Sequence, residues 1–183
     1  MISGNKLRGR TLIIILLALA TSRGVSQKQS QQPWNGALRI QKEVRHELLL
    51  LPYLNVFNNL SFSVDGDEVT LTGQVTRPAM KADAEKAVSH IEGVDRVRNQ
   101  IEVLPVSALD DEIRLHIFNA IYGFAPLQKY ALAVTKPIRI IVKRGHVTLE
   151  GLVDSEADKN NAGIRAHEVA DVFSVTNRLR VAK

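Results

Sequence analysis

An internal repeat constrains the fold of this chain more than any other feature of its sequence. The segment VTLTGQV at Val69–Val75 returns as VTLEGLV at Val147–Val153, and a shift of 78 positions aligns 69–103 with 147–181 without a gap. The aligned windows share twelve identical residues. Identities spread along a window of this length indicate a duplicated structural unit. We therefore expect two modules of about 70 residues, whose thin cores rely on packing because the chain has no cysteine.

The N-terminus is typical of an export signal. Three basic residues precede the apolar stretch Leu12–Ala20, which ends in the small-x-small pattern Ala-Leu-Ala. An uncleaved membrane span would need roughly 17–25 apolar residues, more than this stretch offers. We expect residues 1–20 to be a cleaved signal peptide and residues 21–36 to be a flexible segment. The mature chain is then periplasmic or secreted and has no transmembrane span.

The charge of the mature chain argues against a nucleic-acid partner. The formal net charge of +5 includes the three basic residues of the leader. Without them, 21 Lys and Arg stand against 19 Asp and Glu, which leaves +2. Nucleic-acid-binding proteins usually carry a clustered excess of basic residues. We expect no nucleic-acid binding.

Hydrophobic periodicity predicts the same order of elements in both modules. The first module is predicted to contain a helix over 38–51, a hairpin with its turn at Asp65-Gly66, a helix from Pro78 to Gly93 and a strand over 97–103. The corresponding segments of the second are 109–121, 138–142, 147–153, a helix that begins at Ser155, and 175–181.

These elements predict an α+β fold of two tandem α-β-β-α-β modules. In each module, two helices pack on one face of a three-stranded sheet. A right-handed crossover makes the second and third strands parallel, so each sheet is mixed. We place the modules at residues 37–104 and 105–183.

The repeated motif resembles that of a known family. VTLxGxV, followed by a helix of Ala and charged residues and by a strand with the pattern V-x-x-V-x-N-x-φ-x-V, is similar to the bacterial OsmY and nodulation domain, abbreviated BON. The resemblance covers about Leu38–Leu104 and Leu109–Ala182. One departure is Tyr122–Pro137, which is longer than the matching Leu51–Ser61.

The resemblance implies a class of function. Proteins similar to this family are typically periplasmic or associated with the outer membrane, are linked to osmotic or envelope stress, and contact phospholipid surfaces or other proteins. The family has no established catalytic residues, so the resemblance implies no catalytic residue and no cofactor in this chain.

Four repeated residues are predicted to maintain the architecture. Gly73 and Gly151 share a strand position, where the missing side chain lets the overlying helix approach closely or permits a bulge. Asn99 and Asn177 lie on the apolar side of a strand, where each amide is expected to tie a loop or a helix end to the sheet. A ligand contact is the alternative for both pairs.

No sequence motif indicates catalysis or a metal site. The five histidines are scattered without an HExxH pair, and the chain has neither a GxGxxG loop nor a GxSxG elbow. We therefore expect no enzyme, no metal and no cofactor. A deep polar pocket with clustered carboxylates or histidines would point to an enzyme instead.

The hairpin turns are the clearest difference between the modules. Asp65-Gly66-Asp67-Glu68 in the first module aligns with Lys143-Arg144-Gly145-His146 in the second. One interpretation is that both are ordinary solvated turns. The alternative is that the basic turn, together with Arg139, Lys136 and Lys129, faces anionic lipid headgroups, where each cation contributes about 1 kcal/mol.

Aromatic residues next to this turn offer possible membrane anchors. Tyr122, Phe124 and Tyr130 lie in the long connection before the basic hairpin. On the lipid hypothesis their rings insert at the membrane interface. The alternative is that they pack in the core or against the first module.

The sequence thus favours a non-enzymatic exported envelope protein. Its tandem modules are expected to bind an anionic phospholipid surface or an envelope protein and to support envelope integrity or tolerance of osmotic and envelope stress. The alternative is a secreted protein–protein adaptor without lipid affinity, which docks through its sheets or their edges.

Overall fold

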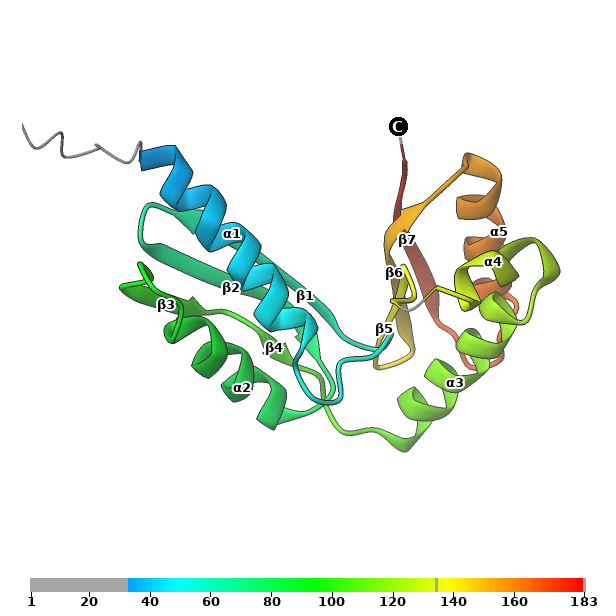
Figure 1. The fold of residues 1–183 in the computed structure, drawn as a ribbon. Coiled ribbons are helices and arrows are strands. Elements are labelled where there is room, and N and C mark those ends of the chain that lie inside the picture. Colours follow the sequence, from blue (N-terminus) through cyan, green and yellow to red (C-terminus); the bar gives the residue numbers. More distant parts are fainter. Residues whose placement is uncertain (1–32, 134, 183) are drawn as a thin grey trace, which may run out of the picture. The chain divides into compact units, whose positions relative to one another are not determined.

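The computed structural model describes residues 33–133 and 135–182, which belong to one compact unit and contain two α+β modules (Figure 1). Module 1 consists of α1 (Pro33–Leu49), β1 (Asn59–Asp65), β2 (Glu68–Val75), α2 (Pro78–Ser89), β3 (Arg96–Asn99) and β4 (Glu102–Val103). Module 2 consists of α3 (Ala108–Tyr122), η1 (Ala125–Leu127), α4 (Gln128–Ala131), β5 (Ile138–Lys143), β6 (His146–Val153), α5 (Glu156–His167) and β7 (Ser174–Val181). The predicted tandem of α-β-β-α-β modules is confirmed.

Both sheets are mixed, as predicted, and they share one register. The middle strand pairs antiparallel with the strand before it and parallel with the strand after the crossover helix, in the orders β1-β2-β3 and β5-β6-β7. Phe62 lies opposite Leu71, and Ile140 lies opposite Leu149, 78 positions later. β3 and β4 both pair with β2 and together take the place that the single strand β7 takes in module 2.

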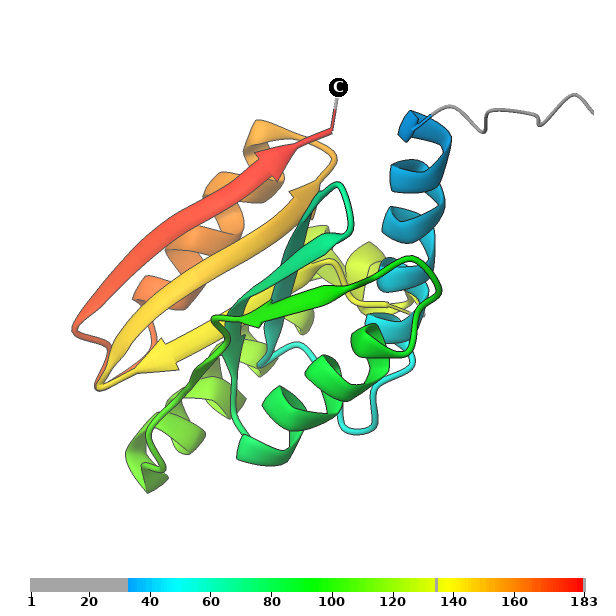
Figure 2. The ribbon, with the colours of Figure 1, turned by 90° about the vertical axis from the view of Figure 1, so that its left-hand side faces the viewer.

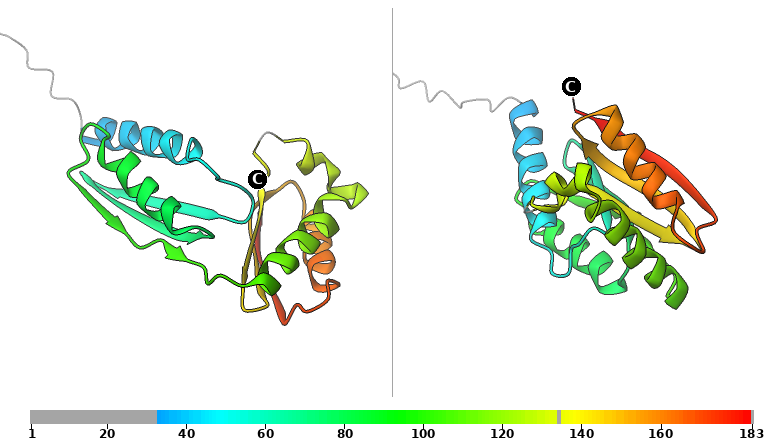
Figure 3. Two further views of the ribbon diagram at one scale, coloured as in Figure 1. Left: turned by 90° about the horizontal axis from the view of Figure 1, so that it is seen from below. Right: turned by 90° about the vertical axis from the view of Figure 1, so that its right-hand side faces the viewer.

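Two helices cover one face of each sheet. In module 1, α1 and α2 contact each other and the sheet, and in module 2 α3 and α5 lie side by side on the sheet (Figures 2 and 3). The buried apolar side chains of each module come from alternate strand positions and from the inner faces of its helices. This burial supplies the main stabilisation of two modules that have no disulfide.

One core residue joins the two modules. Val56 precedes β1 in the chain, yet its side chain is buried in the core of module 2. Its carbonyl oxygen accepts a hydrogen bond from the N–H of Ile140 at 2.8 Å, and the carbonyl of Asn55 accepts one from the guanidinium of Arg139 at 2.8 Å. The turn before β1 therefore bonds to the edge of β5.

The N-terminal expectations are only partly covered by the described residues. α1 begins at Pro33, within the segment 21–36 that the sequence predicts to be flexible. The predicted signal peptide over residues 1–20 lies outside the described residues, as do residues 21–32.

The structure shows why glycine is required at the two repeated positions, Gly73 and Gly151. Gly73 and Gly151 have φ angles of +113° and +128°, and a Cβ at either position would lie 1.9 Å from a backbone oxygen, that of Asn59 or of Pro137. The backbone that approaches them belongs to the start of the neighbouring strand. Of the two causes expected from the sequence, close approach of the overlying helix and a bulge, the first is therefore not found. Glycine is required at both positions by conformation and by space.

Replacement of Gly151 by alanine is expected to destabilise module 2. The left-handed backbone alone costs about 1–3 kcal/mol, and relief of the clash with Pro137 adds to this. Urea unfolding followed by circular dichroism measures the change. The matched control is Gly36→Ala, because Gly36 lies in α1 with open space around it, and alanine there is expected to be neutral or stabilising by about 0.5–1 kcal/mol. Equal stability of G151A and wild type would contradict this account.

Candidate functional site

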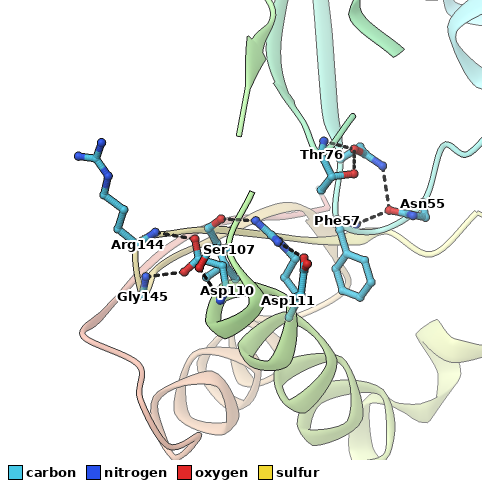
Figure 4. A network of polar contacts seen from close by, with 11 residues as sticks. Asn55, Phe57, Thr76, Ser107, Asp110, Asp111, Arg144 and Gly145 are labelled. Carbon is cyan, nitrogen blue, oxygen red and sulfur yellow. Dashed lines mark hydrogen bonds and ion pairs between the residues drawn. The ribbon is translucent and has the colours of Figure 1, made fainter. Parts of the chain in front are cut away.

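The basic hairpin turn of module 2 is held by a buried carboxylate. Asp110, in the first turn of α3, is 1% exposed, and its two oxygens accept hydrogen bonds from the backbone N–H groups of Arg144 and Gly145 at 2.8 Å each (Figure 4). Ser107 caps the same helix and accepts from the N–H of Asp110. The carboxylate thus fixes the turn, including Arg144 at a φ of 54°, against α3.

A buried arginine fixes the strand that leads into this turn. Arg114 lies one helical turn after Asp110, is buried, and donates from Nη2 to the carbonyl oxygen of Val142 at 2.6 Å. Its Nη1 pairs with the carboxylate of Asp111. Neither Asp110 nor Arg114 is among the site residues predicted from the sequence. The pattern Ser107-x-x-Asp110, a capping-box-like start, was the available signal.

The fixed turn presents a cation to solvent. In Figure 4 the side chain of Arg144 points away from the polar network that holds its backbone. Arg144 is exposed and takes part in none of the ion pairs found among residues 33–133 and 135–182. Its neighbour Lys143 is exposed but pairs with the carboxylate of Glu102.

An exposed aromatic ring lies beside this cation. Phe173 is 79% exposed, its N–H donates to the carbonyl oxygen of Gly145 at 2.9 Å, and its ring centre lies 5.8 Å from that of His146. The imidazole of His146 also contacts the hydroxyl of Ser174 at 2.8 Å. The loop that carries Phe173 is therefore fixed to the basic turn.

Two exposed aliphatic side chains belong to the segment that enters α3. Val106 is 96% exposed and Leu109 is 49% exposed, on either side of the capping residue Ser107. Leu109 precedes Asp110, which binds the basic turn directly. We call the set formed by Val106, Leu109, Arg144, His146 and Phe173 the module 2 tip. It combines exposed apolar groups with a fixed, exposed cation.

Most of the other residues proposed for lipid contact from the sequence have internal roles. Tyr122 and Tyr130 are buried in the core of module 2, so they are removed from the candidate binding face. Phe124 is partly buried and packs beneath the guanidinium of Arg165, 4.5 Å from its ring centre. Arg139 is half-buried and bonds to Asn55. The connection after α3 folds back on its own module as η1 and α4, which accounts for the burial of its rings.

Tyr122 completes the edge of β5. Its hydroxyl donates to the carbonyl oxygen of Ile138 at 2.7 Å and accepts from the N–H of the same residue at 3.2 Å. Burial raises the pKa of this hydroxyl to about 12, so it stays protonated at neutral pH. The residue satisfies a strand edge instead of contacting a membrane.

Tyr130, Lys129 and Asp158 form a polar cluster that anchors α4 to the start of α5. The Asp158 carboxylate accepts from the Tyr130 hydroxyl at 2.8 Å and from the Lys129 ammonium at 2.9 Å. Burial by itself would raise the pKa of Asp158, but the hydrogen bonds from Lys129, Tyr130 and Ser155 outweigh it, so the pKa is lowered. The cluster is a structural tie within module 2.

The repeated asparagines connect helix and sheet in the same way in both modules. The Asn99 amide donates to the carbonyl oxygen of Lys81 in α2 at 2.8 Å, and that of Asn177 donates to Lys159 in α5 at 2.7 Å. Each side-chain oxygen accepts from the backbone N–H two residues later, at Ile101 or Leu179. These bonds leave no amide group of Asn177 directed at a ligand.

The turn of module 1 has the opposite charge and no aromatic neighbour. Asp65, Asp67 and Glu68 surround Gly66, and Glu68 pairs with Arg96 and Arg98. The position 78 residues before Phe173 is Asp95. Two equivalent turns on one scaffold have therefore diverged in charge.

Neither a metal site nor a membrane-spanning helix is found among residues 33–133 and 135–182. Within the described part of the chain, no three His, Asp or Glu side chains are placed to hold a metal ion. None of the helices in these residues has the length and apolar character needed to cross a membrane.

Comparison with known proteins gives a family match. The family model described as BON domain matches residues 38–105 and 127–183, well over half of the chain. The second match begins after α3, at the extra connection noted above. No curated protein matches the chain.

Two solved structures are similar over most of the chain but with low scores. One is CdsD, a structural protein of the type III secretion system of Chlamydia trachomatis, with 13% identity over 79% of this chain and 94% of that chain, and a TM-score of 0.29. The other is the C-terminal domain of CdsD, with 12% identity over 78% of this chain and 96% of that chain, and a TM-score of 0.27. At these scores neither bears on the function of the present chain.

Removal of the Asp110 carboxylate is expected to loosen the basic turn. In Asp110→Ala, the N–H groups of Arg144 and Gly145 lose their acceptors, which costs about 1.5–3 kcal/mol of unfolding free energy. Urea unfolding measures the loss, and hydrogen exchange of the two amides reports its location. Glu112→Ala, an exposed position in the same helix, is the control. Unchanged protection of both amides in D110A would contradict the role of the carboxylate.

The Asp158 cluster predicts a loss of stability in acid. The pKa of Asp158 in the fold lies below the value of about 3.9 for an unfolded chain, so the carboxylate stabilises the fold above that pH and loses this effect as the pH falls through the lowered pKa. Asp158→Asn is expected to flatten this part of the unfolding free energy measured from about pH 6 to pH 3. Asp171→Asn, at an exposed loop position, is expected to keep it.

Proposed function

The chain belongs to the BON domain family, and from this premise we propose that it is an exported, non-enzymatic envelope protein that binds anionic phospholipid surfaces through the module 2 tip. BON domains form a non-catalytic family of binding domains that is often associated with phospholipid binding and with envelope or osmotic stress. The leader-like residues 1–20 support export to the periplasm or beyond. A role in envelope integrity under stress follows from these two properties together.

The observation that carries the proposal is the exposed ring of Phe173 next to the fixed cation Arg144. Peripheral membrane binding needs apolar side chains that enter the interface and cations that attract anionic headgroups. Phe173, Leu109 and Val106 supply the first, and Arg144 supplies the second. Because Asp110 holds the turn, little conformational freedom is lost when this surface binds.

Magnitudes indicate a weak, reversible contact. Burial of a phenylalanine side chain contributes about 2 kcal/mol, and each cation near an anionic surface contributes about 1 kcal/mol. With partial burial of the two aliphatic residues, the total is on the order of 5 kcal/mol, which corresponds to a dissociation constant between about 1 mM and 1 μM. Lys143 adds to the attraction if a phosphate replaces its partner Glu102.

A second candidate function is that of a protein–protein adaptor. It is favoured by a separate observation in module 1, the free outer edge of β1. The two candidates use different surfaces, so an experiment on one does not decide the other.

Co-sedimentation with vesicles of mixed anionic and zwitterionic phospholipid tests the proposed function. At low salt, the full chain is expected to partition onto these vesicles and to release as salt is raised, since the Debye length falls from about 30 Å at 0.01 M to about 8 Å at 0.15 M. Arg144→Glu is expected to weaken partition about 30-fold, because it replaces an attraction of about 1 kcal/mol by a repulsion of similar size. Phe173→Ser is expected to weaken it by a similar or larger factor.

Two matched variants serve as controls for this experiment. Lys86→Glu makes the same charge change at an exposed position of α2, and Leu132→Ser removes another exposed apolar side chain, 88% exposed, at the end of α4. Both are expected to partition as wild type does. Equal partition of R144E, F173S and wild type, or no partition of wild type at low salt, would rule out the module 2 tip as a lipid-binding surface.

A further inference from the structure

The outer edge of β1 has unpaired backbone groups along its whole length. β1 lies at the edge of its sheet and pairs only with β2. Leu71, opposite Phe62, uses its carbonyl oxygen to accept from Gln100 on the other side of β2, so Phe62 belongs to a pair that is not hydrogen-bonded. The N–H and C=O groups of Leu60, Phe62 and Val64 therefore point outward. They have no hydrogen-bond partner among the residues that the structure describes.

Most outward groups of the equivalent edge in module 2 are paired. There, the outward groups belong to Ile138, Ile140 and Val142, in the same register. Tyr122 bonds to both groups of Ile138, Val56 accepts from the N–H of Ile140, and Arg114 donates to the carbonyl oxygen of Val142. One of these partners, Val56, lies in a turn of the chain from outside the module. Backbone from another part of the chain thus bonds to this edge.

β1 also lacks the usual protection of an edge strand. Exposed edges are commonly guarded by charged side chains, proline or a bulge. β3 carries Arg96 and Arg98, and β7 carries Arg178 and Arg180. In contrast, the sequence of β1, Asn-Leu-Ser-Phe-Ser-Val-Asp, has no cation and no proline. It is the only edge in the described part of the chain that is neither covered nor guarded by basic residues.

A basic groove runs beside this edge. α1 lies along β1 (Figure 1), and between them is a groove of about 730 Å³. Lys42 and Arg45 of α1 and Arg180 of β7 line it, and its lining contains no carboxylate. All three cations are exposed, and none of them takes part in an ion pair with another described residue.

We propose that the edge of β1 binds an extended acidic segment of a partner protein by strand addition. The partner backbone pairs with the outward groups of Leu60, Phe62 and Val64, and its carboxylates face Lys42, Arg45 and Arg180. This site combines β1 and α1 of module 1 with Arg180 of module 2, and it does not rest on the lipid binding proposed for the module 2 tip.

Charge and hydrogen bonding decide against other occupants. The segment 21–36 contains Arg23 and Lys28 and no acidic residue, so it does not complement the groove. A second copy paired through its own β1 would bring Lys42 and Arg45 of the two copies together, and like charges oppose this. Phospholipid headgroup phosphates offer acceptors for the cations but no strand that satisfies alternating N–H and C=O groups.

A labelled peptide tests the proposal on the full chain. The probe is a peptide of about ten residues that alternates valine with aspartate or glutamate and so covers the length of β1. Fluorescence anisotropy is expected to show binding that weakens with salt. The double change Lys42→Glu and Arg45→Glu is expected to weaken binding at least tenfold. Lys86→Glu and Arg144→Glu, which change the same charge elsewhere, are expected to leave it unchanged.

Backbone methylation of the probe separates strand addition from simple charge attraction. Successive amides of an added strand point toward and away from the edge, and the acidic face together with the direction of the added strand fixes which set points toward it. N-methylation of alternate residues is therefore expected to abolish binding in one of the two possible sets and to spare the other, with no change in the protein. Anionic vesicles given to the R144E variant form the comparison arm for headgroup binding.

The outcomes decide the proposal in each case. Sensitivity to the groove variants together with sensitivity to one set of methyl groups supports it. No binding of the probe, binding that ignores K42E/R45E, or equal effects of both methylated sets overturns it. Vesicle binding by R144E that is lost only in K42E/R45E also overturns it, because it assigns the groove to headgroups.

Discussion

The hydrogen bonds of the sheet edges govern how these two modules are built and used. A three-stranded sheet leaves each outer strand with one unpaired side, and buried backbone groups without partners are costly. In module 2 the side chains Tyr122 and Arg114 and the backbone of Val56 meet this demand on β5. In module 1 the outward groups of β1 are left without described partners. The same fold thus gives one module a largely paired edge and the other an open one.

The bonds at the edge of β5 also connect the two modules to each other. The carbonyl of Val56 and the side chain of Arg139 connect the segment before β1 to β5, far from the direct link between the modules in sequence. Asn58, buried within the same segment, accepts from the N–H of Thr76 at 2.8 Å and so ties it back to module 1. A segment bonded on both sides restrains their relative motion.

The sequence predicts the architecture far better than the chemistry of the surface. The 78-residue spacing of the repeat predicts that both sheets have the same register. The pair Phe62–Leu71 in module 1 corresponds to the pair Ile140–Leu149 in module 2. Periodicity also places the helices. It does not say that Tyr122 and Tyr130 turn inward, since aromatic rings suit both a core and a membrane interface. Nor does it reveal Asp110, whose role depends on a turn 34 residues later in the chain.

Small duplicated modules also limit the kinds of binding site that this protein can form. In a module of about 70 residues, most apolar side chains are needed for the thin core, and few remain to line a deep enclosed pocket. Binding then falls to the parts that the core does not use, the hairpin tips and the strand edges. Duplication relaxes this limit, because one module can keep an acidic turn and an open edge while the other gains Arg144 and Phe173. Two weak surfaces on one chain reach a useful strength together when both are engaged, since the second contact forms at high effective concentration.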